Sequence, residues 1–167
     1  MKTLIIFIAV LMAGKIYVSA QEQKKDLNVV IVIDTKVITG AMANFRVIAL
    51  LENGGKKVVE VEYSPGNLSL PKSEYEKMLN DEIKTTLLAF DYYEYCKKEQ
   101  TVYNYEIDIK KGWLQHSYYV LYIYNTNKRQ FKGVFDPLEG KNYTFEFDYP
   151  GGSTKRIRKR KLKTDCK

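Results

Sequence analysis

The stretch VYNYEIDIK, residues 102–110, alternates apolar and polar side chains with a period of two. Tyrosine or isoleucine stands at positions 103, 105, 107 and 109, and Asn104, Glu106 and Asp108 stand between them. Successive side chains of a β-strand point to opposite faces, so the pattern predicts a strand with one buried and one solvated face. A helix would instead need apolar residues at spacings of three and four.

The same period recurs along most of the chain. LNVVIVID (27–34) is rich in β-branched residues, as is typical of a central strand. Residues 44–63 predict a hairpin, because Asn53, Gly54 and Gly55 can adopt the positive φ values of a tight turn. Further strands are predicted over residues 85–96, 102–110, 117–125, 130–135 and 142–149. SPGNLSLP (64–71) predicts a loop by its proline, glycine and asparagine content.

One short helix interrupts the strands at PKSEYEKMLNDEI, residues 71–83. Pro71 suits the first position of a helix, and Tyr75, Met78 and Leu79 share one face. We interpret this helix as a lid packed on the core. About eight or nine short strands with a turn every ten residues or so predict a mainly all-β fold, an antiparallel sandwich or barrel.

The stretch DPLEGKNYTFEF, residues 136–147, favours the sandwich. It resembles the part of immunoglobulin-like and fibronectin-type domains in which a leucine, a glycine and a tyrosine lead into a late strand. Leu138, Gly140 and Tyr143 are the matching residues. The resemblance implies an immunoglobulin/fibronectin-like β-sandwich in which the Tyr143 hydroxyl braces the corner between the sheets.

The first 20 residues have the layout of a secretory signal peptide. Lys2 precedes an apolar run over residues 4–14, and small residues at 18–20 form a cleavage signature before Gln21. The run is too short for a stable span, and no later stretch approaches the roughly 20 apolar residues that a spanning helix needs. We therefore expect a secreted or periplasmic protein whose mature chain starts near Gln21, with residues 21–167 forming a single domain.

The positive charge of the chain is concentrated at its C-terminal end, in STKRIRKRKLKTDC (153–166). Residues 155–167 hold eight of the 27 Lys and Arg residues but one of the 20 Asp and Glu residues. The segment is open to three interpretations: a polyanion site, a charged strand that protects a sheet edge, or an unstructured tail. The candidate polyanion-binding residues are Lys155, Arg156, Arg158, Lys159, Arg160, Lys161 and Lys163.

The two cysteines, Cys96 and Cys166, predict a disulfide if the protein is exported, and two separate thiols if it is not. The bond would close a loop of about 70 residues, which the chain-entropy model rates at roughly 4 kcal/mol. It would attach the far end of the basic segment to the end of the strand predicted over 85–96.

Both faces of the strand SYYVLYIYN (117–125) carry large apolar groups. One face, with Tyr119, Leu121 and Ile123, suits the core. The opposite face, with Tyr118, Tyr122 and Tyr124, is either an open aromatic platform for a sugar, a peptide or a protein, or a second core layer beneath a helix or a long loop.

The sequence gives little evidence of a catalytic site. His116 is the only histidine and is expected to be solvated in a turn, and no nucleophilic triad, zinc site or phosphate-binding loop can be assembled. Two carboxylate pairs, Glu106/Asp108 and Glu146/Asp148, are expected on the wet side of a sheet, although such a pair could serve a hydrolase. We expect no cofactor and no metal.

These observations favour a secreted or periplasmic, non-catalytic binding module that uses the basic segment and the tyrosine face. Its expected partners are an anionic glycan, a lipid headgroup or an envelope protein. Nucleic acid is not expected, because no recognition motif is present. The alternatives are a structural or assembly subunit of the cell envelope and, as the weakest, a carboxylate-pair hydrolase.

Overall fold

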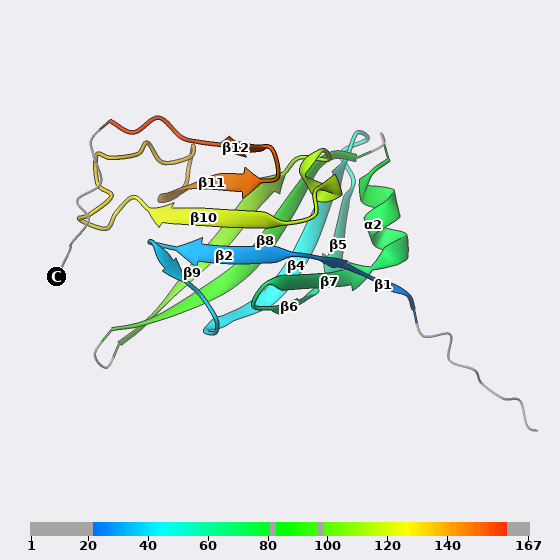
Figure 1. Cartoon of the computed structure of the whole chain (residues 1–167), viewed down its shortest axis with the longest axis horizontal. Coiled ribbons are helices and arrows are strands. Elements are labelled where there is room, and N and C mark those ends of the chain that lie inside the picture. Colours follow the sequence, from blue (N-terminus) through cyan, green and yellow to red (C-terminus); the bar gives the residue numbers. More distant parts are fainter. Residues whose placement is uncertain (1–21, 81–82, 97–98, 160–167) are drawn as a thin grey trace, which may run out of the picture.

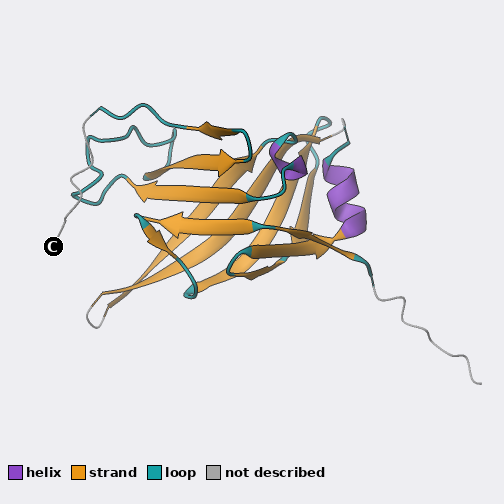
Figure 2. Cartoon of the chain, viewed as in Figure 1, coloured by secondary structure: helices purple, strands orange, loops and turns teal. Residues whose placement is uncertain are grey.

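The computed structural model describes residues 22–80, 83–96 and 99–159, and the predicted signal peptide lies outside them. Most of this part of the chain is β-strand (Figures 1 and 2). A five-stranded sheet has the order β12-β11-β10-β2-β3, with β2 (Val29–Ile33), β3 (Lys36–Val37), β10 (Tyr119–Asn125), β11 (Tyr143–Tyr149) and β12 (Gly152–Thr154). A four-stranded sheet has the order β5-β4-β8-β9, with β4 (Met42–Leu51), β5 (Lys56–Glu60), β8 (Ile83–Cys96) and β9 (Glu99–Ile109). A three-stranded sheet has the order β1-β7-β6, with β1 (Lys24–Leu27), β6 (Glu62–Ser64) and β7 (Asn67–Pro71).

The five-stranded and four-stranded sheets pack face to face around one core. Tyr105 and Ile107 of β9 are buried on one side of this core, and Tyr119, Leu121 and Ile123 of β10 on the other. These are the residues that the period-two pattern assigned to the inner faces. Burying each large aliphatic side chain contributes about 1.5–3 kcal/mol, so the alternation holds the two sheets together. The predicted all-β sandwich with one short helix is confirmed.

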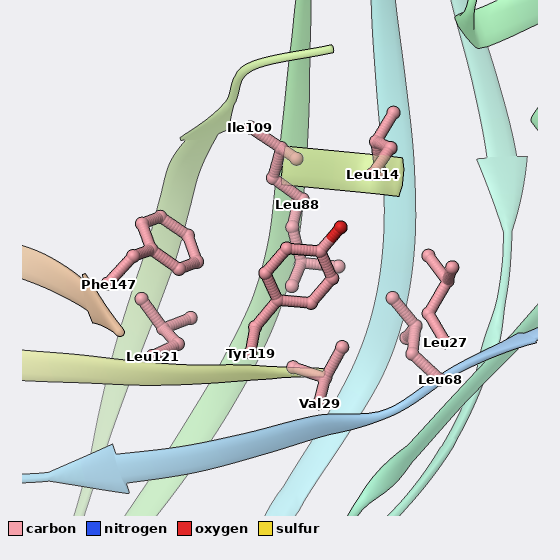
Figure 3. A pocket seen from close by; sticks show the side chains of 9 residues that line it. All are labelled: Leu27, Val29, Leu68, Leu88, Ile109, Leu114, Tyr119, Leu121 and Phe147. Carbon is pink, nitrogen blue, oxygen red and sulfur yellow. The ribbon is translucent and has the colours of Figure 1, made fainter. Parts of the chain in front are cut away.

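An apolar cavity of about 20 Å³ lies in the core (Figure 3). The side chain of Tyr119 lies among the others that line it: Leu27, Val29, Leu68, Leu88, Ile109, Leu114, Leu121 and Phe147. This volume is about that of one water molecule, and a lining of this kind gives a water too few polar partners to hold it. The cavity is therefore a packing gap and not a ligand site.

One strand pair departs from the predicted antiparallel arrangement. β2 and β10 are parallel, in a register that runs from Val29 opposite Tyr119 to Ile33 opposite Ile123. The other ladders between the described strands are antiparallel. The alternation of side chains fixes the faces of a strand but says nothing about the direction of its neighbour, so the sequence could not reveal this pair.

In two segments the secondary structure is the opposite of the one predicted. The predicted loop 64–71 contains β7, which pairs with β6 through a turn at Gly66 (φ +92°) and buries Leu68 and Leu70. The predicted strand 130–135 is instead part of the loop between β10 and β11. Its apolar side chains pack on the outer face of the five-stranded sheet, against Tyr124: Phe131, Val134 and Phe135.

The predicted helix is present but shorter than expected. α2 (Lys72–Met78) follows Pro71 and ends well before Ile83, which starts β8. Met78 is buried, and the Tyr75 hydroxyl donates a 3.1 Å hydrogen bond to the carbonyl of Leu114, beside the short 3₁₀ helix η1 (Trp113–Gln115). The helix therefore covers one end of the core, as predicted for a lid.

The predicted hairpin over residues 44–63 is confirmed by β4 and β5, with Gly54 at φ +83° in the turn. A bulge between Ala43 and Arg46 interrupts β4 at its other end and places Asn44 at φ +55°. There Asn44 and Asn104 each donate a 2.6 Å hydrogen bond from their amide nitrogen to the carboxylate of Asp91. The pKa of Asp91 lies below its ordinary 3.8, mainly because of the hydrogen bond from Asn44. Burial acts in the opposite direction and raises this pKa, and the bond from Asn104 lowers it further.

Tyr143 joins the two large sheets. Its hydroxyl accepts a 2.8 Å hydrogen bond from the backbone N–H of Glu106 and lies 2.9 Å from the carbonyl oxygen of the same residue, to which it donates. Tyr143 starts β11, whereas Glu106 lies in β9 of the opposite sheet. The brace implied by the resemblance is present, but it reaches across the sandwich and not to a backbone group a few residues upstream.

A second polar contact joins the sheets at the end where β8 and β9 extend past β4 (Figure 1). The Lys128 ammonium lies 2.7 Å from the carboxylate of Asp34 and 2.5 Å from that of Glu94. It also lies 5.7 Å from the ring centre of Tyr103, whose hydroxyl donates to Glu94. Burial alone would lower the pKa of Lys128, but the two carboxylates outweigh it and raise that pKa.

We expect Tyr143→Phe to lower the free energy of unfolding by about 1–3 kcal/mol, because the Glu106 backbone groups lose their partner. Urea denaturation measures this. Tyr118→Phe, which removes the hydroxyl of an exposed tyrosine, is the matched control and should change stability by less than about 0.5 kcal/mol. Equal effects of the two substitutions would contradict the role given to Tyr143.

We expect Asp91→Asn to destabilise the protein by about 1 kcal/mol at pH 7, because charged acceptors make the stronger hydrogen bonds. A carboxylate with a depressed folded-state pKa stabilises the fold above its unfolded pKa, and this contribution is lost as the pH falls through the folded-state pKa. The difference in stability between wild type and variant should therefore shrink below about pH 4 in urea titrations. A difference that is as large at pH 3 as at pH 7 would show that the charge of Asp91 is irrelevant.

Candidate functional site

The first part of the basic segment lies alongside β11. After β12 the chain continues as an extended, non-strand segment over residues 155–159, and it ends against the loop between β10 and β11 (Figure 1). There the backbone N–H of Lys159 donates a 2.8 Å hydrogen bond to the carbonyl of Val134. The described part of the segment is thus neither a free tail nor, beyond Thr154, a regular edge strand.

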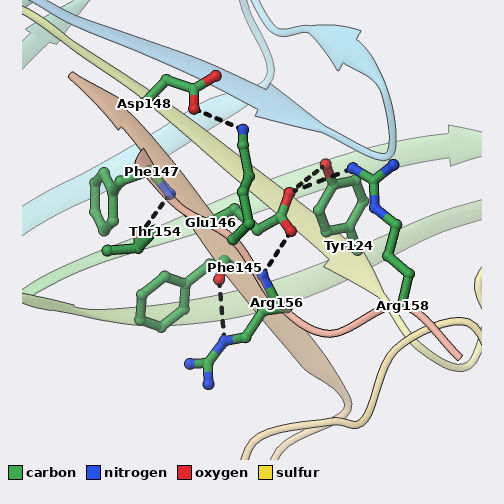
Figure 4. A network of polar contacts seen from close by, with 9 residues as sticks. Tyr124, Phe145, Glu146, Phe147, Asp148, Thr154, Arg156 and Arg158 are labelled. Atoms are coloured by element: carbon green, nitrogen blue, oxygen red, sulfur yellow. Dashed lines mark hydrogen bonds and ion pairs between the residues drawn. The ribbon is translucent and has the colours of Figure 1, made fainter. Parts of the chain in front are cut away.

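Glu146 is the residue that holds this segment (Figure 4). Its side chain on β11 is only 1% exposed. One carboxylate oxygen accepts a 2.8 Å hydrogen bond from the backbone N–H of Arg156, and the other accepts a 3.1 Å bond from the Tyr124 hydroxyl and lies 3.7 Å from the guanidinium of Arg158. A buried carboxylate is costly unless donors and a positive charge surround it, so Glu146 requires the basic segment in this position.

Two further ion pairs lie at the ends of the segment. The Lys155 ammonium lies 2.6 Å from Asp148, and the Lys159 ammonium lies 2.6 Å from Asp136. Arg156 differs from these lysines, because its Nε donates to the carbonyl of Phe145 (3.3 Å) and its guanidinium lies 5.6 Å from the ring centre of the same residue. The other predicted basic residues, Arg160, Lys161 and Lys163, lie outside the described residues.

The loop between β10 and β11 adds two cations that sequence analysis missed. Arg129 and Lys132 are exposed on the loop against which the segment packs. The guanidinium of Arg158 lies 5.7 Å from the ring centre of Phe135 in this loop. Basic residues interleaved with apolar ones in KRQFKGVF (128–135) were the available signal, but nothing in the sequence placed them beside residue 158. We call Arg129, Lys132 and residues 155–159 the basic corner.

The three tyrosines of the predicted aromatic face do not form an open row. Tyr118 is 47% exposed, and Tyr122 is half-buried with the Lys155 ammonium 5.1 Å from its ring centre. Tyr124 is only 5% exposed, because Phe131 and Phe135 cover it with ring centres at 5.3 and 4.5 Å. One end of this face is therefore a second core layer beneath a long loop, and a platform of three tyrosines is excluded.

Both carboxylate pairs are on outer faces, but their surroundings differ. Glu106 is half-buried and pairs with Lys141 at 2.6 Å, a hydrogen bond that lowers the pKa of Glu106, while Asp108 is exposed. Glu146 is buried instead of solvated as the sequence suggested. Neither pair lines the apolar core cavity or the cleft beside α2.

His116, which was expected to be solvated in a turn, is half-buried. Its ring stacks on that of Tyr149, with ring centres 4.6 Å apart. Within residues 22–80, 83–96 and 99–159, no three His, Cys, Asp or Glu side chains gather in a way that could hold a metal ion.

A cleft of about 110 Å³ lies between α2 and the strands β4 and β5. Its floor is apolar, with Ala49, Leu51, Val59, Met78 and Ile83. At its mouth the Glu74 carboxylate pairs with Lys57 at 2.5 Å and Lys77 at 2.9 Å, and the hydrogen bonds from these lysines lower the pKa of Glu74. Because these charges satisfy one another, the described lining of the cleft contains no unpaired carboxylate or ammonium group.

Cys96 ends β8 and is exposed. Its predicted partner, Cys166, lies outside the described residues, so the disulfide stays a prediction. In the part of the chain that the structure describes, no helix has the length and hydrophobicity needed to cross a membrane. Comparison with protein-family models, with curated proteins and with solved structures gives no significant match to this chain.

We expect Glu146→Gln to loosen the basic segment, because the buried charge that attracts Arg158 is removed. Trypsin cleavage after Arg156 and Arg158, followed by mass spectrometry, should become about tenfold faster, equivalent to about 1.4 kcal/mol of local opening. The control is Asp148→Asn, which removes the more exposed partner of Lys155 and should change cleavage by less than about threefold. If Glu146→Gln is cleaved no faster than wild type, Glu146 does not hold the segment.

Proposed function

We propose that this protein is an exported, non-catalytic binding domain whose basic corner contacts a sulfated or phosphorylated polyanion, such as a glycan or a lipid headgroup. The observation that carries the proposal is the position of residues 155–159. Hydrogen bonds and ion pairs hold this stretch against β11 and its neighbouring loop. The stretch is therefore ordered before a ligand arrives, and binding costs less conformational entropy than it would for a free tail. The signal-peptide pattern of residues 1–20 supports export.

The charges available to a ligand differ from those that the sequence suggested. Lys155, Arg158 and Lys159 each pair with a carboxylate of the domain. Arg129, Lys132 and Arg156 are exposed and make no ion pair with a carboxylate among the described residues. We therefore assign direct ligand contacts to these three side chains and a positioning role to the paired ones.

The test removes these three charges together. We expect Arg129→Gln/Lys132→Gln/Arg156→Gln to weaken binding to heparin and to vesicles containing phosphatidylserine by at least about tenfold, and to flatten the dependence of affinity on salt, because fewer counterions are released. The Arg156 backbone N–H that binds Glu146 is retained, so the segment stays in place.

The matched control is Lys56→Gln/Lys72→Gln/Lys84→Gln, which removes three exposed charges at the α2 end of the sandwich. It should retain most of the affinity. Equal losses in the two triple variants would mean that only net charge matters, and no binding of the wild-type protein to either probe would refute the proposed function.

An assembly subunit is the second candidate function. The observation that favours it is the position of β9 at the edge of the four-stranded sheet, where no other described strand pairs with its outer side.

A further inference from the structure

β9 is a long edge strand whose outward hydrogen-bonding groups can be identified. It pairs with β8 along its whole length, in an uninterrupted register from Thr86 opposite Ile109 to Cys96 opposite Glu99. The N–H and C=O of Glu106 bind the Tyr143 hydroxyl, so they point away from β8. Because these groups alternate in direction along an antiparallel strand, those of residues 100, 102 and 104 also point outward.

This outward edge lacks the features that usually protect one. Natural edge strands are blunted by lysines, prolines, bulges or shortness. Residues 100–105, QTVYNY, contain no charge and no proline, and the charged residues of β9 are Glu99 at its start and Glu106 and Asp108 towards its end. Of residues 99–104, all but Tyr103 are exposed, and Val102 is 47% exposed.

The other sheet edges differ. The opposite edge of the same sheet, β5, carries Lys56, Lys57 and Glu60. The edges of the five-stranded sheet are β3 and β12, which have two and three residues. Among the described edges of the two large sheets, β9 is thus the one that is both long and unprotected.

We propose that β9 pairs with β9 of a second copy of this chain, antiparallel, about a two-fold axis that passes beside Val102. This register places residue 100 opposite residue 104 of the other copy, so that all three pairs of outward groups meet. Such a contact is isologous, since the same strand serves both sides. The backbone N–H and C=O of Glu106 are already bonded to the Tyr143 hydroxyl, so the pairing between the two copies ends before this residue.

The side chains of this register are compatible with one another. Val102 faces the same valine of the other copy and has Tyr93 beside it on β8, which gives a continuous apolar row. Gln100 faces Asn104, and Thr101 faces Tyr103. No two like charges lie opposite each other in this register.

The contact is small and should therefore be reversible. About five residues of each copy take part, so the total buried surface falls well below the roughly 1,200 Å² that stable interfaces need. The dimer should form with increasing protein concentration, and its backbone hydrogen bonds should give most of the affinity.

The first test combines sedimentation with amide hydrogen exchange from about 10 µM to 1 mM, a range chosen for weak association. As dimers form, the amides of Gln100, Val102 and Asn104 should become protected. Those of Thr101 and Tyr103, which bind β8, should not change, and Glu106 should be protected at every concentration. A protein that stays monomeric, or one that associates without protection at 100, 102 and 104, would overturn the proposal.

The second test compares two equivalent substitutions. Val102→Lys places two ammonium groups opposite each other at the two-fold axis and should raise the dimer Kd by at least about tenfold. Val58→Lys changes a valine of similar exposure (50%) on β5 and should leave the Kd unchanged. Equal Kd values for the two variants would refute the β9 interface. The triple variant of the basic corner should dimerise normally, so failure of the proposed function would leave this inference standing.

Discussion

The burial of one carboxylate, that of Glu146, determines how the C-terminal part of this structure is arranged. A charged group beneath a loop is tolerated only when donors reach it, and the donors here are a backbone N–H, a tyrosine hydroxyl and an arginine. Residues 155–159 supply two of these three donors. The loop between β10 and β11 excludes water from this side of the sheet by packing Phe131 and Phe135 on Tyr124. Loop, sheet and basic segment therefore depend on one another.

The sandwich itself follows from a simpler constraint, which is visible in the sequence. Period-two alternation alone assigns Tyr105, Ile107, Tyr119 and Leu121 to the core, and all four are buried there. The same alternation could not show that β2 runs parallel to β10, because side chains alternate alike in both directions. The prediction also failed at 64–71, where proline, glycine and asparagine indicated a loop but residues 67–71 form a strand, and at 130–135, where three apolar residues are buried within an irregular loop.

The candidate site was only partly predictable, because long-range contacts decide it. The basic residues were visible in the sequence, but their pairing with Asp136, Glu146 and Asp148 was not. Glu146 and Asp148 have the same spacing as Glu106 and Asp108, yet only Glu146 is fully buried. The difference arises from a loop that covers one outer face and leaves the other open. A local sequence pattern cannot show which face of a sheet a distant loop will cover.

The two proposed surfaces lie on different sheets and involve different physics. The basic corner offers long-range charge on a pre-ordered segment, and the β9 edge offers short-range backbone hydrogen bonds. An exported protein with both could bind a polyanion while pairing with itself, and two copies on one polymer would bind more tightly than one.

The central claim, that residues 155–159 belong to the folded body, is tested most directly by ¹⁵N relaxation of the purified protein. The account expects heteronuclear NOE values for Arg156 and Arg158 close to those of β11, together with a slowly exchanging Arg156 amide. Low NOE values for both arginines, typical of a free chain end, with rapid exchange of that amide would contradict it.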